Sequence, residues 1–260
     1  MIGIFDSGIG GLTAVKEIIT LTPGEELVYF GDTGRVPYGT RSAQTITRYA
    51  EQDAAFLMSK NVDAIVVACG TVSTTALSHL KSILPIPVTG VVEPSATAAV
   101  NATKNGKIAV IGTSATIRSG AFERAIKEIL PSAEVVSQAC PLFVPLVENG
   151  FVAADDPITA LTVERYLAPI KESGADTLIL GCTHYPLIAD AIAKFLPDVT
   201  LINSGAEAAK EAVRLLGKKE GVPSVSYFVS DDPAMFDKNA SLFLGNELHG
   251  EVNKINIEEF

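Results

Sequence analysis

Two similar segments of the chain, 62–71 and 178–187, most constrain what it can fold into. In each, an apolar run is followed by a cysteine and soon by a hydroxyl side chain, with Cys69 in the first segment and Cys182 in the second. A short apolar run that ends in a polar turn ahead of a helical pattern is typical of a buried parallel strand. Since ligands bind beyond the carboxyl ends of such strands, the repeat predicts two thiols at equivalent edges of two sheets.

The rest of the chain alternates between short apolar runs and longer helical patterns. Besides the strands that end at the two cysteines, we expect strands at 2–5, 27–30, 88–92, 108–111, 134–137, 199–202 and 225–229. The intervening segments predict helices that end near 21, begin at 73 or 74, at 94 and near 157, and cover 42–60, 118–130, 206–216 and 233–244. Strands that alternate with helices predict parallel βαβ units.

The pattern restarts in the middle of the chain. Segment 108–113 resembles 2–7, just as the second cysteine segment resembles the first. We therefore predict an α/β protein with two related parallel-sheet domains and an active site between them. The first domain is expected to comprise 1–93 plus 206–260, and the second 94–205.

Composition and charge exclude several classes of protein. The 260 residues and 47% hydrophobic content are enough for cores in one large or two smaller domains. The net charge of −10 argues against a nucleic-acid partner, because phosphate binding needs clustered Lys and Arg, and a pocket for a small anion must then be locally positive. We expect neither a membrane span nor a secretory signal, and the three cysteines indicate free thiols in a cytoplasmic protein.

The thiols of Cys69 and Cys182 have two alternative roles. Free cysteine is often a small buried hydrophobe, and either residue alone could be that. Two thiols at matched strand ends instead suit one task, which is to remove a proton from one face of a carbon and to return one to the opposite face. Cys140 lies between Ala139 and Pro141 without a neighbouring acid or His, so it is interpreted as a packing residue.

Three acid–base side chains accompany the thiols. Asp6 stands where the first strand meets its glycine turn and can orient or deprotonate a thiol, although a helix N-cap is its alternative role. His184 is two residues from Cys182 and can accept the proton of that thiol, although it could be a structural imidazole. Glu148 stands in a predicted loop and either joins the site or is a surface charge.

Hydroxyl side chains stand at successive strand-to-helix turns, and they are Ser7, Thr71, Thr113, Thr116 and Thr183. Together with backbone N–H groups at helix starts, they can attract carboxylates locally, although the negative net charge of the chain repels anions at long range. An amino acid with two carboxylates fits such a site. The turn that contains Tyr38 and Gly39 is either a further wall of the site or only a loop.

Neither a cofactor nor a metal is expected. The glycines at 8, 10 and 11 imitate a dinucleotide fingerprint, with Asp32 at the end of the second strand, but Thr13 stands where that motif needs Gly or Ala. Cys69, Cys182 and His184 lack the spacing of a zinc site, and no lysine follows a buried strand to anchor pyridoxal phosphate.

Six motifs resemble the glutamate racemases, a family within the cofactor-independent aspartate/glutamate racemase superfamily. In order, they are F-D-S-G-I-G-G (5–11), V-P-Y-G (36–39), A-C-G-T (68–71), I-G-T-S-A-T-I (111–117), P-L-V-E-N-G (145–150) and G-C-T-H-Y-P (181–186). The resemblance implies that L- and D-glutamate are interconverted without a cofactor, which supplies D-glutamate for peptidoglycan. It also implies a cytoplasmic homodimer.

The resemblance assigns roles to individual residues as well. Cys69 would deprotonate D-glutamate with help from Asp6. Cys182 would deprotonate L-glutamate with help from His184, and Glu148 would lie nearby. The residues that would hold the substrate are Asp6, Ser7, Tyr38, Gly39, Gly70, Thr71, Thr116, Thr183 and His184.

Two positions depart from the family pattern. Gly70 stands where the family has Asn after the first cysteine, so a side-chain amide is missing although the backbone N–H remains, and Phe122 replaces a common Tyr. Both departures bear on affinity and substrate range rather than on the type of reaction. The alternatives are a racemase for aspartate or another acidic amino acid, and a non-catalytic amino-acid-binding module, which would have no use for a second thiol.

Overall fold

The two thiol segments belong to different parallel sheets in the computed structural model, which describes residues 1–248 and 250–260. The first sheet has the order β10 (Val252–Lys254), β9 (Ser224–Val229), β2 (Glu26–Gly31), β1 (Ile2–Asp6), β3 (Ala64–Val67), β4 (Val88–Gly90). The second has the order β6 (Glu134–Ala139), β5 (Lys107–Gly112), β7 (Thr177–Leu180), β8 (Thr200–Asn203). Every neighbouring pair in these two sheets is parallel, so the predicted fold class is confirmed.

Helices connect the strands as expected for βαβ units. The α-helices are α1 (Leu12–Leu21), α2 (Ala43–Ser59), α3 (Gly70–Thr75), α4 (Leu77–Ile83), α5 (Val92–Ala102), α6 (Ser114–Ser119), α7 (Ala121–Ile129), α8 (Phe143–Glu148), α9 (Pro157–Ser173), α10 (Ala189–Phe195), α11 (Ser204–Leu216) and α12 (Pro233–Leu244). Three short 3₁₀ helices are η1 (Tyr38–Thr40), η2 (Tyr185–Ile188) and η3 (Ile257–Glu259). Within the described residues, no helix is long and apolar enough to cross a membrane.

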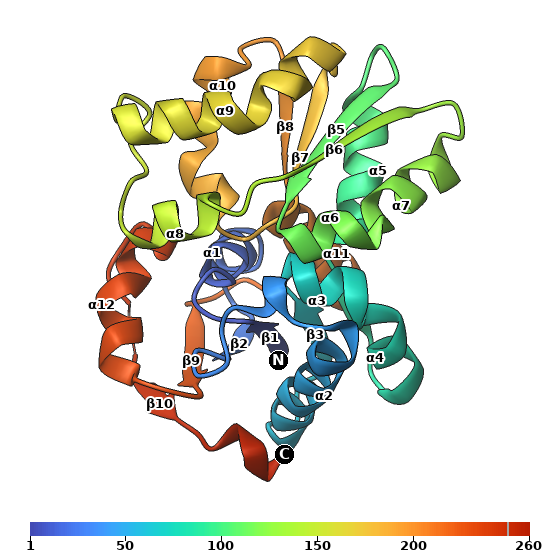
Figure 1. Ribbon diagram of the computed structural model, residues 1–260. Helices are drawn as coiled ribbons and strands as arrows, with labels where there is room; N and C mark the ends of the chain where they lie inside the picture. Colours follow the sequence, from blue (N-terminus) through green and yellow to red (C-terminus); the bar gives the residue numbers. More distant parts are fainter. Residues whose placement is uncertain (249) are drawn as a thin grey trace.

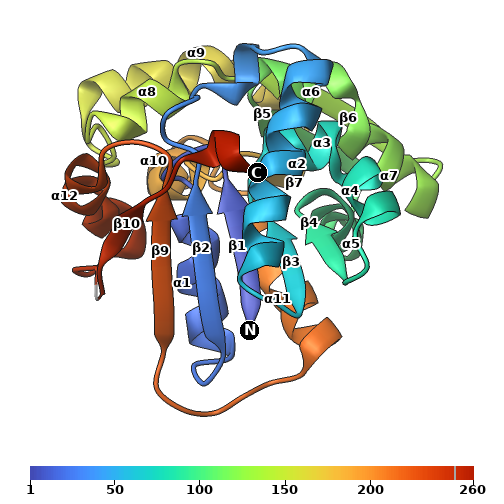
Figure 2. The ribbon, with the colours of Figure 1, turned by 90° about the horizontal axis from the view of Figure 1, so that it is seen from below.

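Helices cover both faces of the first sheet, which explains why its strands are apolar on both sides. Alternate side chains of a strand point to opposite faces, and β1 follows this rule. Ile2 and Ile4 pack in the cluster that includes α1 and α11, whereas Phe5 packs in the cluster that includes α2. Figure 2 shows this sheet with α1 and α2 on its opposite sides.

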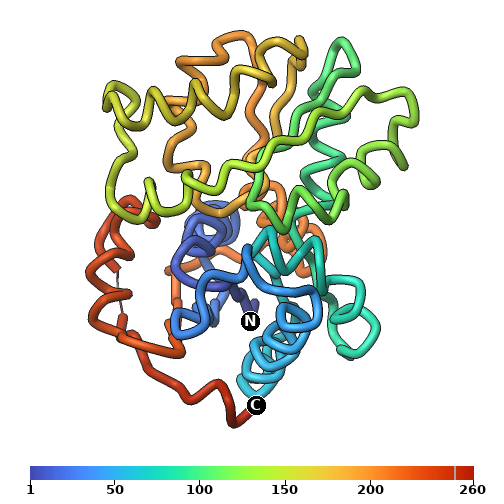
Figure 3. The backbone as a smooth tube through the Cα atoms, viewed as in Figure 1, coloured from blue at the N-terminus to red at the C-terminus, as the bar shows by residue number. Residues whose placement is uncertain are grey.

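The two halves lie one above the other, with the second sheet uppermost in Figure 1. Both termini lie in the lower half (Figure 3). The chain begins with β1 in the first sheet, and after the second sheet it returns to the first, where β9 pairs with β2 and β10 pairs with β9. Thr13 on α1 lies 3.1 Å from the carbonyl oxygen of Thr183 and donates a hydrogen bond across the halves. The division into 1–93 plus 206–260 and 94–205 stays a prediction.

Three local predictions are wrong. The helix expected from Ser73 begins at Gly70, so Cys69 itself precedes the helix. Segment 118–130 is two helices, because Gly120 adopts a φ of 64° and ends the first of them. Glu148, expected in a loop, is the last residue of the short helix α8. The β-branched residues of α3 have low helix propensity, so only their burial in the folded chain makes that turn helical.

Candidate active site

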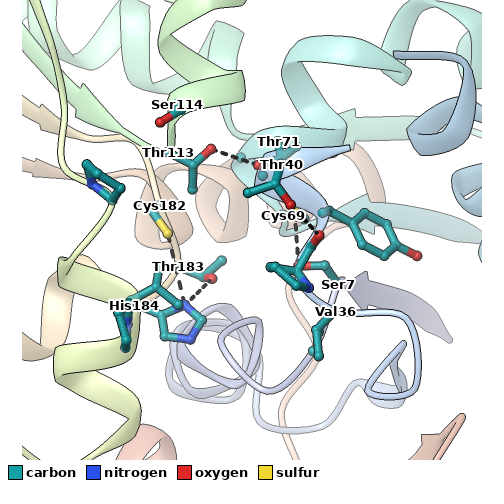
Figure 4. A pocket seen from close by; sticks show the side chains of 18 of the residues that line it. Ser7, Val36, Thr40, Cys69, Thr71, Thr113, Ser114, Cys182, Thr183 and His184 are labelled. Carbon is teal, nitrogen blue, oxygen red and sulfur yellow. Dashed lines mark hydrogen bonds between the residues drawn. The ribbon is translucent and has the colours of Figure 1, made fainter. Parts of the chain in front are cut away.

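A cavity of about 380 Å³ lies where the carboxyl ends of the two sheets face each other (Figure 4). Its walls come from turns after β1, β2 and β3 in the first half and after β5, β6 and β7 in the second. Eleven of the residues predicted from the sequence line it, namely Ser7, Tyr38, Gly39, Cys69, Gly70, Thr71, Thr113, Glu148, Cys182, Thr183 and His184. Two predicted residues, Asp6 and Thr116, do not line the cavity and lie behind its walls.

Cys69 occupies the first side of the cavity. Its side chain is buried, and its Sγ donates a hydrogen bond to Oγ of Ser7 at 3.5 Å. Burial, followed by the negative charge of Asp6, raises the pKa of the Cys69 thiol to about 12. This sulfur therefore holds its proton at neutral pH and is suited to give it up only to a strong base.

Asp6 lies behind Cys69 at the end of β1. Its Oδ2 accepts a hydrogen bond from the N–H of Gly8 at 2.9 Å, whereas its buried Oδ1 has no partner among the described residues. Burial raises the pKa of Asp6, while the positive charge of His184 and the Gly8 N–H act to lower it. An unsatisfied buried carboxyl oxygen of this kind is costly and is available to a proton or a cationic ligand group.

Cys182 occupies the opposite side and has a different neighbour. Its Sγ lies 4.0 Å from Nδ1 of His184 (Figure 4). Nε2 of the same imidazole lies 2.9 Å from Oε1 of Glu148. Burial acts to lower the pKa of His184, but hydrogen bonds with Cys182 and Glu148, and the charges of both, raise it to about 10. At neutral pH the imidazole is therefore protonated and can exchange a proton with the sulfur beside it.

A row of hydroxyl groups crosses from one half to the other above the thiols. Oγ1 of Thr71, after β3, lies 3.0 Å from Oγ1 of Thr113, after β5. Thr113 in turn lies 3.0 Å from Oγ1 of Thr116, so Thr116 contacts the cavity wall rather than the cavity. These hydroxyls can rotate to donate to a carboxylate, which suits an anionic ligand.

Tyr38 and Gly39 form part of the first half's wall, but the phenol of Tyr38 is directed elsewhere. Its hydroxyl hydrogen-bonds with Asp32 and, at 3.1 Å, with Asp53, and the side chain is almost fully buried. Burial, with the charges of Asp53 and Asp32, raises the pKa of Tyr38 far above its ordinary value. Tyr38 therefore lines the cavity without offering its hydroxyl to a ligand, since that group is engaged by the two aspartates.

Two glycines allow the halves to approach closely. A side chain at Gly10 would overlap Thr183 and His184, and one at Gly70 would overlap the carbonyl oxygen of Gly181. Gly70 thus stands at the contact between the two thiol-bearing turns, and the space of the family's Asn side chain is taken by the opposite backbone. Phe122, the other departure, is buried and lies beside Gly181.

The sequence did not indicate all of the cavity wall. Thr40, Pro141 and Val144 also line it, and nothing in the sequence around them indicated a site. Val36 and Ser114 line it as well and lie within two of the motifs quoted above. Their proximity depends on how the two halves pack. In the described part of the chain, no group of three or more His, Cys, Asp or Glu side chains is arranged to hold a metal ion.

The chain is similar to known proteins along nearly its whole length. The sequence profile described as Asp/Glu/Hydantoin racemase matches residues 11–212. Glutamate racemase from Geobacter metallireducens is 48% identical over 264 aligned positions, covering 99% of this chain and 97% of that protein. The crystal structure of glutamate racemase from Francisella tularensis in complex with D-glutamate has a TM-score of 0.92 at 38% identity, covering 100% of this chain and 98% of that one. Picrophilus torridus aspartate racemase has a TM-score of 0.62 at 17% identity, covering 85% and 95% respectively, so it shares the fold alone.

Proposed function

Because this chain belongs to the Asp/Glu/Hydantoin racemase family, and within it to the glutamate racemases, we propose that it interconverts L- and D-glutamate with two thiols. One observation carries the proposal: Cys69 and Cys182 line one cavity from different halves of the molecule. Each sulfur has its own acid–base neighbours, which a packing cysteine does not need. A non-catalytic binding module would have no reason to contain this second thiol.

In the proposed reaction, the proton leaves one face of Cα and a different proton arrives on the other. With L-glutamate, Cys182 is the thiolate, having released its proton to His184, and it takes the Cα proton. The electron pair left on Cα delocalises into the α-carboxylate, and the thiol of Cys69 then delivers its proton to the opposite face. The product is D-glutamate, with Cys182 as thiol and Cys69 as thiolate, and the reverse reaction retraces these steps.

Two physical effects allow a thiolate to remove the proton from Cα of glutamate, which is a very weak acid. Holding the sulfur against the Cα proton can contribute roughly 7–11 kcal/mol through proximity and orientation. Hydrogen bonds that strengthen as charge develops on the α-carboxylate can contribute about 3 kcal/mol each, more effectively in a closed cavity than in water. The hydroxyls of Ser7, Thr71 and Thr183, and the backbone of Gly39 and Gly70, are the proposed donors.

The substrate class follows from the charges around the cavity. The chain carries a net charge of −10, so attraction for a dicarboxylate must be local. A protonated His184 and the row of threonine hydroxyls supply it. The unsatisfied Oδ1 of Asp6, which lies behind the cavity wall, is the proposed acceptor of the proton that Cys69 releases.

We extend the proposal to the cellular role on the basis of family membership. The enzyme is proposed to act without a cofactor or metal, in the cytoplasm and as a homodimer, and to supply D-glutamate for peptidoglycan synthesis. The aspartate racemases remain the second candidate, since they share the fold.

A panel of amino acids tests the proposal. The protein is incubated with L-glutamate, D-glutamate and L-aspartate, and the circular dichroism of each amino acid is followed. Decay of both glutamate signals to zero, without decay of the aspartate signal, is expected. Decay with aspartate alone would identify the sister activity, and ligand binding without any decay would identify a binding module.

A further inference from the structure

A buried polar cluster lies behind the Tyr38 wall of the cavity, and the proposed reaction does not use it. We call Asp32, Arg35, Tyr38 and Asp53 the Arg35 cluster. The side chains of both aspartates are 0% exposed and that of Arg35 is 11% exposed. Asp32 follows β2, Arg35 and Tyr38 belong to the next turn, and Asp53 comes from the middle of α2.

The two aspartates have different partners. Asp32 accepts hydrogen bonds from Nε of Arg35 at 2.6 Å, from Oγ of Ser230 at 2.7 Å and from the hydroxyl of Tyr38. Oδ1 of Asp53 accepts one hydrogen bond, from Nη2 of Arg35 at 3.0 Å. Oδ2 of Asp53 lies 3.1 Å from the Tyr38 hydroxyl, which has only one proton.

Counting protons resolves the arrangement. The Tyr38 hydroxyl donates its one hydrogen bond to Asp32, which is the nearer of its two partners. The Tyr38 oxygen can then hydrogen-bond with Asp53 only as an acceptor, so Oδ2 of Asp53 must carry a proton. The charges agree, because one guanidinium cannot neutralise two buried carboxylates, and an uncompensated buried charge is very costly.

We propose that Asp53 is held as a neutral carboxylic acid and is a positioning residue, which fixes the turn at 36–40 by donating a hydrogen bond to Tyr38. This inference rests on the proposed function, because its consequence for catalysis requires that Tyr38 and Gly39 form the wall of a substrate site. The chain of hydrogen bonds runs from Asp53 through Tyr38 to Asp32, and Arg35 closes it into a ring.

The surroundings of Asp53 favour the neutral form. Burial and the negative charge of Asp32 raise the pKa of Asp53 well above its ordinary value, and the positive charge of Arg35 opposes this without reversing it. Asp6, at the end of β1, adds a further unfavourable negative charge.

The cluster also ties the turn to distant segments. Nη1 of Arg35 lies 2.5 Å from Oε1 of Gln52 and 3.4 Å from Oε1 of the exposed Glu258. The N–H of Gly34 donates to Oγ of Ser230 at 2.8 Å. The turn is thus held by α2 on one side and by the chain after β9 on the other. Within these hydrogen bonds, Asp53 is the residue of α2 that contacts the Tyr38 hydroxyl.

Paired substitutions at Asp53 separate a neutral hydrogen-bond donor from a carboxylate. In Asp53→Asn, the amide oxygen can accept from Arg35 and the amide nitrogen can donate to Tyr38, so KM for glutamate stays within about twofold of wild type. In Asp53→Leu the donor is lost, and KM rises by about tenfold or more with a smaller change in kcat. Asp237→Asn, an exposed aspartate on α12, is the matched control for removal of a charge.

Equal losses in Asp53→Asn and Asp53→Leu would overturn the assignment, because they would show that a carboxylate is needed. Since Asp53→Leu could fail to fold, the protonation state is also measured directly. In protein with ¹³C-labelled aspartate, the Asp53 side-chain carboxyl resonance is assigned by its loss in Asp53→Asn. It is expected to keep the chemical shift of a neutral acid from about pH 5 to about pH 8.

A carboxylate shift for Asp53 in that range would overturn the proposal whatever the activity of the variants. The spectrum is recorded without substrate, so it does not depend on the reaction. Conversely, absence of racemisation by the wild-type protein would contradict the proposed function while leaving the protonation state of Asp53 intact.

Discussion

The two thiol-bearing turns are built alike and equipped differently. Cys69 and Cys182 both follow a short buried strand of a parallel sheet, and both line one cavity. Cys69 has an acid behind it and a pKa raised to about 12, whereas Cys182 has an imidazole whose pKa is raised to about 10. The two sulfurs thus follow equivalent strand ends, while their neighbours differ, with a buried acid behind Cys69 and an imidazole beside Cys182.

This difference bears on how one site can deprotonate both L- and D-glutamate. At any moment the proposed reaction needs one thiol and one thiolate. In two identical environments, either sulfur would be equally ready to lose its proton. His184 beside Cys182 and Asp6 behind Cys69 make the two sulfurs differ in this respect. The predictions below test how far this asymmetry extends.

Serine substitutions at the two thiols are expected to have the largest effect. An alcohol releases its proton far less readily than a thiol, so Cys69→Ser and Cys182→Ser should each lower kcat by roughly a thousandfold or more. Cys140→Ser is the matched control at the third cysteine and should keep kcat within about twofold. Circular dichroism of glutamate measures the rates, and full turnover in either active-site variant would rule out the two-thiol reaction.

Substitution of the two neighbours is expected to slow the reaction less and to reveal its asymmetry. Asp6→Asn and His184→Asn should each lower kcat/KM by about a hundredfold. The enantiomers have equal free energy in water, so this loss must be the same in both directions. The difference should appear in primary isotope effects with Cα-deuterated substrate, larger for D-glutamate in Asp6→Asn and larger for L-glutamate in His184→Asn. The same pattern in both variants would contradict the assigned sides.

A methyl group at Gly70 tests whether close approach of the two turns matters. In Gly70→Ala the new Cβ would lie well inside van der Waals distance of the Gly181 carbonyl oxygen, so the two turns must move apart by about 1 Å to reach ordinary contact. Because proton transfer is sensitive to distance, kcat/KM should fall by about tenfold or more, with some loss of stability. Gly205→Ala adds a methyl with ordinary contacts only and is the control. Unchanged kinetics in Gly70→Ala would show that the spacing of the halves is not critical.

The last prediction concerns stability rather than rate, and it involves only the His184 side of the cavity. His184 binds its proton more tightly in the folded chain, since its pKa rises from 6.5 to about 10. Its contribution to stability is complete below the unfolded pKa and is lost as pH rises toward the folded one, so the free energy of unfolding should decrease with pH above 6.5. Urea titrations below about pH 9 avoid the similar effect of Cys69.

His184→Gln should flatten this pH dependence, whereas His79→Gln, at an exposed histidine, should retain it. An unchanged slope in His184→Gln would contradict the proposed pairing of His184 with Cys182 and Glu148.

Much of the fold was predictable, because strand patterns depend on local sequence. The apolar runs before Cys69 and Cys182 indicated strands of two sheets. Ser42 and Asp232 are residue types that favour helix N-caps, and their side chains accept hydrogen bonds from the first turns of α2 and α12. The start of α3 at Gly70 was not predictable, since tertiary burial overrides the weak propensity of its residues. The short edge strand β10 was also missed, because it has little apolar character.

For the candidate site, the sequence indicated the side chains that carry chemistry but not their supports. Cys69 and Cys182 lie 113 positions apart, yet their shared motif predicted that they would meet, and they do line one cavity. The Arg35 cluster had no such signature. Ser230 contacts Asp32 across 198 positions, and only the packed structure brings them together. The roles of these residues stay predictions until they are measured.

The origin of the Cα hydrogen tests the central claim most directly. L-glutamate is converted in deuterated water, and both enantiomers are recovered early and analysed by mass spectrometry. If two sulfurs act on opposite faces, the D-glutamate carries deuterium at Cα while the remaining L-glutamate still carries protium. D-glutamate that keeps the substrate's own protium would mean that a single base serves both faces, which would contradict the account.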